Sequence, residues 1–125
     1  MSIRFQADSD LKFGIVTGVR KLESAIDFAS SVDSHLHGIG DPELLEMAAA
    51  ANRILVSHDR QTMLNHFRNR LAEGNHSPGL LIVSQFALIG PVVESIVFLW
   101  SISEAAELRD QAFHLPSLVR HVFPR

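Results

Sequence analysis

Aspartates follow or open several apolar segments of this sequence, and their side chains are the ones best suited to chemistry. Asp8 follows the apolar residues 3–5, Asp59 follows the apolar residues 54–56, and Asp41 opens a helical stretch. In an α/β domain the carboxyl ends of parallel strands point into one crevice, where ligands bind. Carboxylates gathered there repel one another, and a hard divalent cation relieves that repulsion. The sequence therefore predicts Mg²⁺ or Mn²⁺ chemistry on phosphates, with Asp8, Asp41 and Asp59 as the metal ligands.

The pattern of apolar residues predicts alternating strands and helices that position these acids. The expected strands cover residues 3–7, 26–29, 54–57, 80–84 and 111–115, and the second lies nearer an edge. The expected helices cover residues 10–21, 41–51, 62–73 and 92–108, the last with a break near 101–103. Strands separated by helices of this length form βαβ units. We expect one α/β domain over residues 1–125, a three-layer α/β/α sandwich with a mostly parallel sheet of about five strands.

The amino-acid composition excludes several kinds of chemistry. The chain has 125 residues, of which 46% are hydrophobic, as expected for a packed domain. Because it has no cysteine, disulfides, thiolate catalysis and thiolate zinc sites are excluded. The net charge of −3 argues against a broad electrostatic grip on nucleic acid. A metal-bridged contact with one phosphate remains open, because the ions supply the local positive charge.

One apolar stretch needs comparison with a membrane span. Residues 80–102 carry a single formal charge, Glu94, and are long enough to cross a bilayer. Gln85, Gly90-Pro91 and several serines interrupt the stretch, so we expect a buried strand, a turn and a helix instead. Residues 1–6 lack a charged segment leading into a long apolar one, so no secretion signal is expected. The sequence predicts a cytoplasmic protein with no membrane association.

Taken singly, these residues also have ordinary structural explanations. Asp41 before Pro42 is typical of a helix N-cap, and Asp59 fits a turn acid equally well. Asp8 is favoured as functional because Asp10 suffices to cap the following helix. His35 and His37 have a spacing seen at metal sites, but a solvent-exposed loop is the favoured interpretation.

The region after Asp59 also contains candidate substrate contacts. Arg60 is placed to bind a phosphate, and Thr62 to contact phosphate or substrate. Two other phosphate chemistries are disfavoured. A phosphoacceptor receiver domain needs a lysine after its fifth strand, and a haloacid-dehalogenase-type phosphatase needs a downstream lysine. The only lysines here are Lys12 and Lys21, both near the start.

The wider pattern resembles a bacterial family of small PIN-like proteins related to the toxin nucleases of VapBC-type systems. The resemblance covers about residues 3–116 and rests on Ala7-Asp8-Ser9-Asp10, Gly40-Asp41-Pro42-Glu43-Leu44-Leu45, Arg53-Ile54-Leu55-Val56-Ser57-His58-Asp59 with Thr62-Met63, Pro78-Gly79 and Ile89-Gly90. It implies a Rossmann-like sandwich with Asp8, Asp41 and Asp59 at an acidic site. Those carboxylates would hold one or two Mg²⁺ or Mn²⁺ ions that promote cleavage of RNA.

The chain also departs from the family pattern. Many relatives carry Glu then Asn after the first Asp, where this chain has Ser9-Asp10. PIN nucleases generally use about four acids, and the fourth is not identified here; Glu43, Glu46 and Glu94 are the candidates. We therefore expect a metal-dependent ribonuclease, with a protein antitoxin as partner. The alternative is a catalytically weak PIN-like module for protein interaction or regulation. Residues 92–100 are apolar on more than one face, which favours a homodimer.

Overall fold

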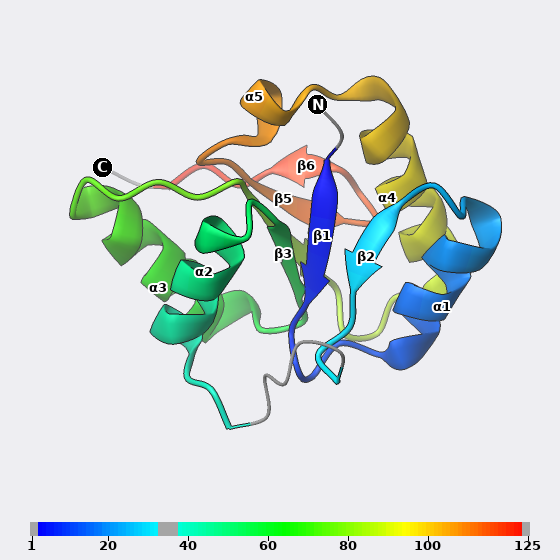
Figure 1. Cartoon of the computed structure of the whole chain (residues 1–125), viewed down its shortest axis with the longest axis horizontal. Coiled ribbons are helices and arrows are strands. Elements are labelled where there is room, and N and C mark those ends of the chain that lie inside the picture. The colour runs from blue at the N-terminus through cyan, green and yellow to red at the C-terminus, as the bar shows by residue number, and fades with distance from the viewer. Residues whose placement is uncertain (1–2, 33–37, 124–125) are drawn as a thin grey trace.

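The computed structural model describes residues 3–32 and 38–123, which form an α/β domain built on one mixed sheet (Figure 1). The strands are β1 (Arg4–Ala7), β2 (Asp27–Ala29), β3 (Ile54–Ser57), β4 (Leu80–Val83), β5 (Ala112–Leu115) and β6 (Val119–Arg120). The helices are α1 (Phe13–Leu22), α2 (Asp41–Ala50), α3 (Arg60–Ala72), α4 (Ile89–Ile102) and α5 (Ala105–Leu108). The strand order is β2-β1-β3-β4-β5-β6, and only β6 is antiparallel to its neighbour.

The predicted α/β class and mostly parallel sheet are confirmed. The expectation of about five strands is one short, because the chain turns back after Pro116 and adds the two-residue β6 to the sheet. The expected edge position of β2 and the break between α4 and α5 are also present. Residues 80–102 form β4, a turn and α4, and no helix in the described part of the chain is long and apolar enough to cross a membrane.

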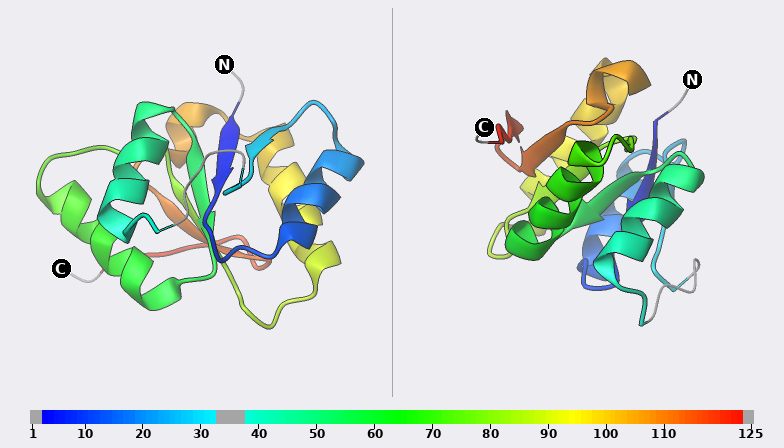
Figure 2. Two further views of the ribbon diagram at one scale, coloured as in Figure 1. Left: turned by 60° about the horizontal axis from the view of Figure 1, so that its bottom comes forward. Right: turned by 90° about the vertical axis from the view of Figure 1, so that its left-hand side faces the viewer.

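Helices cover both faces of the sheet, with α1 and α4 on one face and α2 and α3 on the other (Figure 2). Successive residues of a strand point to opposite faces. In β3, Ile54 and Val56 pack with α1 and α4, whereas Leu55 packs with α2 and α3. All four residues of β3 and of β4 are buried, as expected for central strands covered on both sides.

The direction of the chain reverses around β1. The first crossover, through α1, places β2 on one side of β1, and the second, through α2, places β3 on the other. Such a change of direction opens a crevice at the carboxyl ends of the two strands. In this fold the change of direction falls between the carboxyl ends of β1 and β3.

The starts of α1, α3 and α4 differ from the predicted starts, and two assigned caps are wrong. α4 begins at Ile89 instead of at residue 92. α1 begins at Phe13 after Lys12, so Asp10 does not cap it. In α2 the N-cap position belongs to Gly40, and Asp41 is the first helical residue. Thr62 is not the start of α3, which begins at Arg60. These shifts release the side chains of Asp10 and Asp41 from capping.

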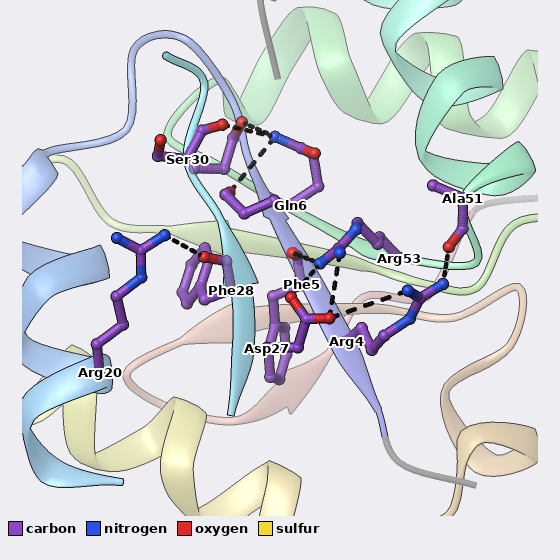
Figure 3. A network of polar contacts seen from close by, with 11 residues as sticks. Arg4, Phe5, Gln6, Arg20, Asp27, Phe28, Ser30, Ala51 and Arg53 are labelled. Carbon is purple, nitrogen blue, oxygen red and sulfur yellow. Dashed lines mark hydrogen bonds and ion pairs between the residues drawn. The ribbon is translucent and has the colours of Figure 1, made fainter. Parts of the chain in front are cut away.

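Ion pairs connect residues near the amino ends of the strands, an end of the sheet that we call its amino edge (Figure 3). The opposite end of the strands is the carboxyl edge. The guanidinium of Arg53 donates to both carboxylate oxygens of Asp27 at 2.8 and 3.2 Å, and to the carbonyl of Phe5 at 3.0 Å. The pKa of Asp27 is lowered, chiefly by the hydrogen bond from Arg53. Arg4 donates to the carbonyl of Ala51 and lies 3.9 Å from Asp27. Arg53 thus ties β1 and β2 to the residue that leads into β3.

Two glycines set the separation of α1 and α4. A Cβ atom at Gly14 would lie 3.0 Å from Cδ1 of Ile89, and one at Gly18 would lie 2.7 Å from Cγ2 of Val93. Val93 is buried, and its branched side chain has little rotational freedom in a helix. The close packing of the two helices therefore depends on the missing side chain at Gly18.

Replacing Gly18 with alanine is expected to lower the free energy of unfolding by about 1–3 kcal/mol, because the added methyl overpacks this contact. Gly90→Ala is the matched control, because nothing lies within 4 Å of a Cβ at that position of α4. Its effect should be small, because Gly90 lies in the first turn of α4 and directly precedes Pro91, where an added Cβ is disfavoured in helical backbone. Urea denaturation followed by circular dichroism measures both. Equal effects of the two substitutions would contradict the predicted close contact.

Candidate functional site

The pairing of β1 with β3 places Asp8 beside Ser57. Ala7 is opposite Val56, and the Asp8 amide donates to the Val56 carbonyl at 2.9 Å. The Ser57 hydroxyl then donates to Oδ2 of Asp8 at 2.7 Å, and its oxygen accepts the Asp59 amide at 3.0 Å. Asp8 is 5% exposed and Ser57 is fully buried. One hydroxyl therefore links the acids that follow the two strands.

The carboxylates of Asp8 and Asp59 also have local partners. Oδ1 of Asp8 accepts the Ser9 amide at 2.6 Å. Oδ1 of Asp59 accepts the Thr62 amide at 2.9 Å, which makes Asp59 the N-cap of α3. No hydrogen bond from the described residues reaches Oδ2 of Asp59. Asp59 is thus both the predicted turn acid and a residue with one oxygen available to a ligand.

Asp41 approaches these acids from α2. Burial raises the pKa of Asp41, and the nearby carboxylates of Asp8, Asp59 and, more weakly, Asp10 raise it further. His66 on α3 acts in the opposite direction. Within the described residues, no side chain or amide donates a hydrogen bond to the Asp41 carboxylate. The predicted trio is therefore brought into electrostatic contact at one edge of the sheet.

The ends of two helices offset part of this negative charge. Both α2 and α3 begin at the carboxyl edge of the sheet, α2 with Asp41 and α3 directly after Asp59. The free amides at a helix N-terminus carry a partial positive charge, worth about 0.3–1 kcal/mol to a nearby carboxylate. This compensation is incomplete, because the pKa of Asp41 stays above its usual value.

Two further acids lie near this set, Glu43, which is exposed in the first turn of α2, and Asp10. Asp10 is the one that acts on Asp41. It lies exposed in the turn after Asp8 and contributes to the raised pKa of Asp41. Of the acids considered from the sequence, Glu46 is paired with Arg70 at 2.5 Å, and Glu94 lies on α4, which covers the opposite face of the sheet. The helix cap predicted at Asp10 is absent from the structure, because Lys12 holds the N-cap position of α1.

His58 has a structural task at this edge. Its Nδ1–H donates to the Val83 carbonyl at 3.1 Å, because a carbonyl cannot donate. Nε2 accepts the Lys12 amide at 3.3 Å, so this nitrogen carries no proton in that contact. The Lys12 ammonium donates to the Gln85 carbonyl at 2.8 Å. His58 thus joins the ends of β3 and β4 to the start of α1, and both ring nitrogens are engaged.

The acids at this edge suit a hard divalent cation that also binds the phosphate oxygens of a substrate. Among the described residues, no three acidic or histidine side chains are arranged to hold a metal ion. Mg²⁺ does not need such a closed set, because in phosphate chemistry it is held by about one or two carboxylates together with waters and phosphate oxygens. The carboxylates of Asp8, Asp41 and Asp59 offer oxygen ligands, the type that Mg²⁺ and Mn²⁺ prefer. The donor set therefore fits an ion whose coordination is completed by phosphate.

The remaining predicted residues lie near this edge or outside the described part. Arg60 is exposed at the first position of α3. Thr62 is exposed too, and its amide is used by Asp59. His35 and His37 lie outside the described residues. Ser57 was missed, because a buried serine at a strand end gives no signal until the register of β1 and β3 is known.

Comparisons of the chain with protein-family models, with characterised proteins and with solved structures find no match. The structure itself defines a small α/β protein with a mostly parallel six-stranded sheet and acids gathered at its carboxyl edge.

The proximity of the acids can be measured through Asp41. We expect its pKa, followed by carbon-detected NMR in the presence of EDTA, to lie above the usual value and to fall in Asp8→Asn and Asp59→Asn, because each removes a neighbouring charge. Asp110→Asn is the control, because Asp110 lies at the opposite edge, bonded to Ser77 and His76. If the pKa of Asp41 is the same in the native protein and in all three variants, the acids do not lie close enough to interact.

Proposed function

We propose that this chain is a PIN-like ribonuclease that cleaves RNA phosphodiester bonds with Mg²⁺ or Mn²⁺, as the cytoplasmic toxin of a toxin–antitoxin pair. The observation that carries the proposal is that the Ser57 hydroxyl joins Asp8 to the Asp59 backbone at the ends of β1 and β3, near Asp41, whose pKa is raised by burial and by these two acids. These are the acids that the sequence resemblance assigns to the metal site. Perturbed titration at a carboxyl-edge crevice is characteristic of functional sites.

In this proposal each residue has a defined task. Asp8, Asp41 and Asp59 would hold the metal, and Asp10 would supply the further carboxylate. A metal bound there would provide an activated water and a charge that stabilises the leaving oxygen. Ser57 acts as a positioning residue, because its hydroxyl fixes Oδ2 of Asp8 and the backbone of Asp59.

Substrate contacts come from the start of α3. The Arg60 guanidinium is suited to a phosphate oxygen, with which it forms charge-assisted hydrogen bonds. Thr62 is exposed on the same helical turn. The helix N-terminus adds a favourable field for an anion.

The direct test is cleavage of single-stranded RNA in Mn²⁺. We expect cleavage by the native protein and a loss of at least about 100-fold in Asp8→Asn, because a metal ligand is removed while the shape of the side chain is kept. Ser57→Ala should lose less activity. It should also need more Mn²⁺ for half-maximal rate, which a purely structural effect would not produce.

Glu94→Gln serves as the charge-matched control, because this acid is exposed on α4. Equal cleavage by the native, Asp8→Asn and Glu94→Gln proteins would point to a contaminating nuclease. No cleavage by any of them, with Mn²⁺ failing to raise the melting temperature of the native protein, would refute the assignment.

A second candidate function, a protein-interaction module, is favoured by an apolar surface near the acids. We call it the apolar lip: Phe13, Phe86, Leu88 and Ile89 at the starts of α1 and α4. Phe86 is 94% exposed and Leu88 is 76% exposed. Large apolar side chains gathered on a surface mark protein interfaces. An antitoxin or a second copy of the chain would cover the apolar lip, and in the second case the protein is a homodimer.

The apolar lip can be tested by molar mass. If it is the dimer interface, the native protein sediments as a dimer, and Phe86→Ser/Leu88→Ser sediments as a monomer with an unchanged circular dichroism spectrum. Phe98→Ser on the outer side of α4, where Phe98 is 50% exposed, is the control and should leave the mass unchanged. If instead Phe98→Ser dissociates the dimer, the interface lies along α4. A native monomer would refute the homodimer and leave the antitoxin as the occupant.

A further inference from the structure

A groove runs between α3 and the segment after β6. We call it the α3 groove; its volume is about 500 Å³, and it is lined by Arg60, Gln61, Leu64, Asn65, Arg68, His121 and Phe123. The α3 residues follow one another at intervals of one and three positions, so they form a continuous stripe along one side of the helix. The other wall comes from residues about fifty positions later in the chain.

The described residues that line the α3 groove are basic or neutral. Arg60 and Arg68 are exposed, and none of these described lining residues is acidic. Behind it, His114 and His121 meet with their Nε2 and Nδ1 atoms 3.0 Å apart. Burial lowers the pKa of His114, and the nearby His121 and Arg60 lower it further. In a chain whose net charge is −3, positive groups are therefore concentrated along this groove.

The second wall of the α3 groove is aromatic and held in place. The Phe123 ring stacks on Phe67 of the core with centroids 5.9 Å apart, and its other neighbour, His121, lies 4.7 Å away in an edge contact. The His121 amide donates to the Ala112 carbonyl at 2.7 Å. A flat, partly exposed ring fixed in this way can receive a base with little loss of conformational entropy.

The α3 groove leads away from the acidic site. Arg60 directly follows Asp59, the N-cap of α3, and Arg68 lies eight residues further along the helix, or about 12 Å at the rise of an α-helix. The two guanidinium groups therefore suit phosphates of different nucleotides. A strand with one phosphate at the acids would continue along this groove.

From these contacts we infer that the α3 groove binds single-stranded RNA, with phosphates on Arg60 and Arg68 and a base against Phe123. Basic grooves with aromatic platforms bind single strands largely irrespective of sequence. The inference rests on the proposed function for the choice of RNA as the ligand. It adds that the affinity for RNA resides in a surface separate from the carboxylates and does not require the metal.

The test is binding of a labelled oligouridylate, measured by fluorescence anisotropy in EDTA, so that cleavage plays no part. We expect Arg60→Gln/Arg68→Gln to weaken binding about 10-fold or more. It should also reduce the slope of log affinity against log salt by about 1.4, because two phosphate contacts are lost. Phe123→Leu keeps an apolar contact with Phe67 and should weaken binding about 5-fold or more through lost stacking, with an unchanged salt slope.

Arg109→Gln is the charge-matched control, because Arg109 is exposed at the opposite edge of the sheet and lines a different pocket. Its binding should match the native protein. Equal RNA affinity in all variants, with cleavage still dependent on Asp8, would overturn the groove and leave the ribonuclease intact. Weakened binding in the groove variants, with no cleavage by any protein, would support the groove and remove the ribonuclease. Melting temperatures of each variant verify that it is folded.

Discussion

The hydroxyl of Ser57 is the contact on which the acidic edge depends. A carboxylate as buried as Asp8 is costly unless hydrogen bonds satisfy it, and the parallel register of β1 and β3 brings that hydroxyl within 2.7 Å. The same oxygen accepts the amide of Asp59 and so sets the start of α3. The pairing of β1 with β3, the burial of Asp8 and the start of α3 therefore depend on the same contact. A shift in the register of the two strands would disturb all three.

The sequence was sufficient for features that depend on local pattern. The apolar residues 54–56 and 80–83 are typical of buried strands, so the position of Asp59 after a strand followed directly. The tasks of Asp10 and Asp41 were misjudged because capping depends on backbone angles that residue type constrains only weakly. Ser57 and the aromatic wall at Phe123 could not be predicted, because each is defined by partners about fifty residues away.

Acidic side chains have different surroundings at the amino edge and at the carboxyl edge of the sheet. At the amino edge Asp27 is bonded to Arg53, and Asp110 accepts from Ser77 and His76; both have lowered pKa values. At the carboxyl edge Asp41 has other acids as neighbours, and its pKa is raised. The first arrangement stabilises the fold at neutral pH, whereas the second costs stability. Acids at the amino edge have hydrogen-bonding partners, whereas acids at the carboxyl edge repel one another. Repulsion that is retained only at the carboxyl edge favours a binding role for that edge.

The net charge of the chain does not describe the charge that a ligand meets at one place on the surface. A net charge of −3 argued against a broad grip on nucleic acid, but that argument assumes that the charge is spread evenly. Here the acids gather at the ends of β1 and β3, whereas Arg60, Arg68 and His121 line the α3 groove. The field that a phosphate meets depends on the local arrangement and not on the sum. An acidic centre next to a basic groove attracts a polyanion along α3 and repels it at the carboxylates, unless a divalent cation is present there.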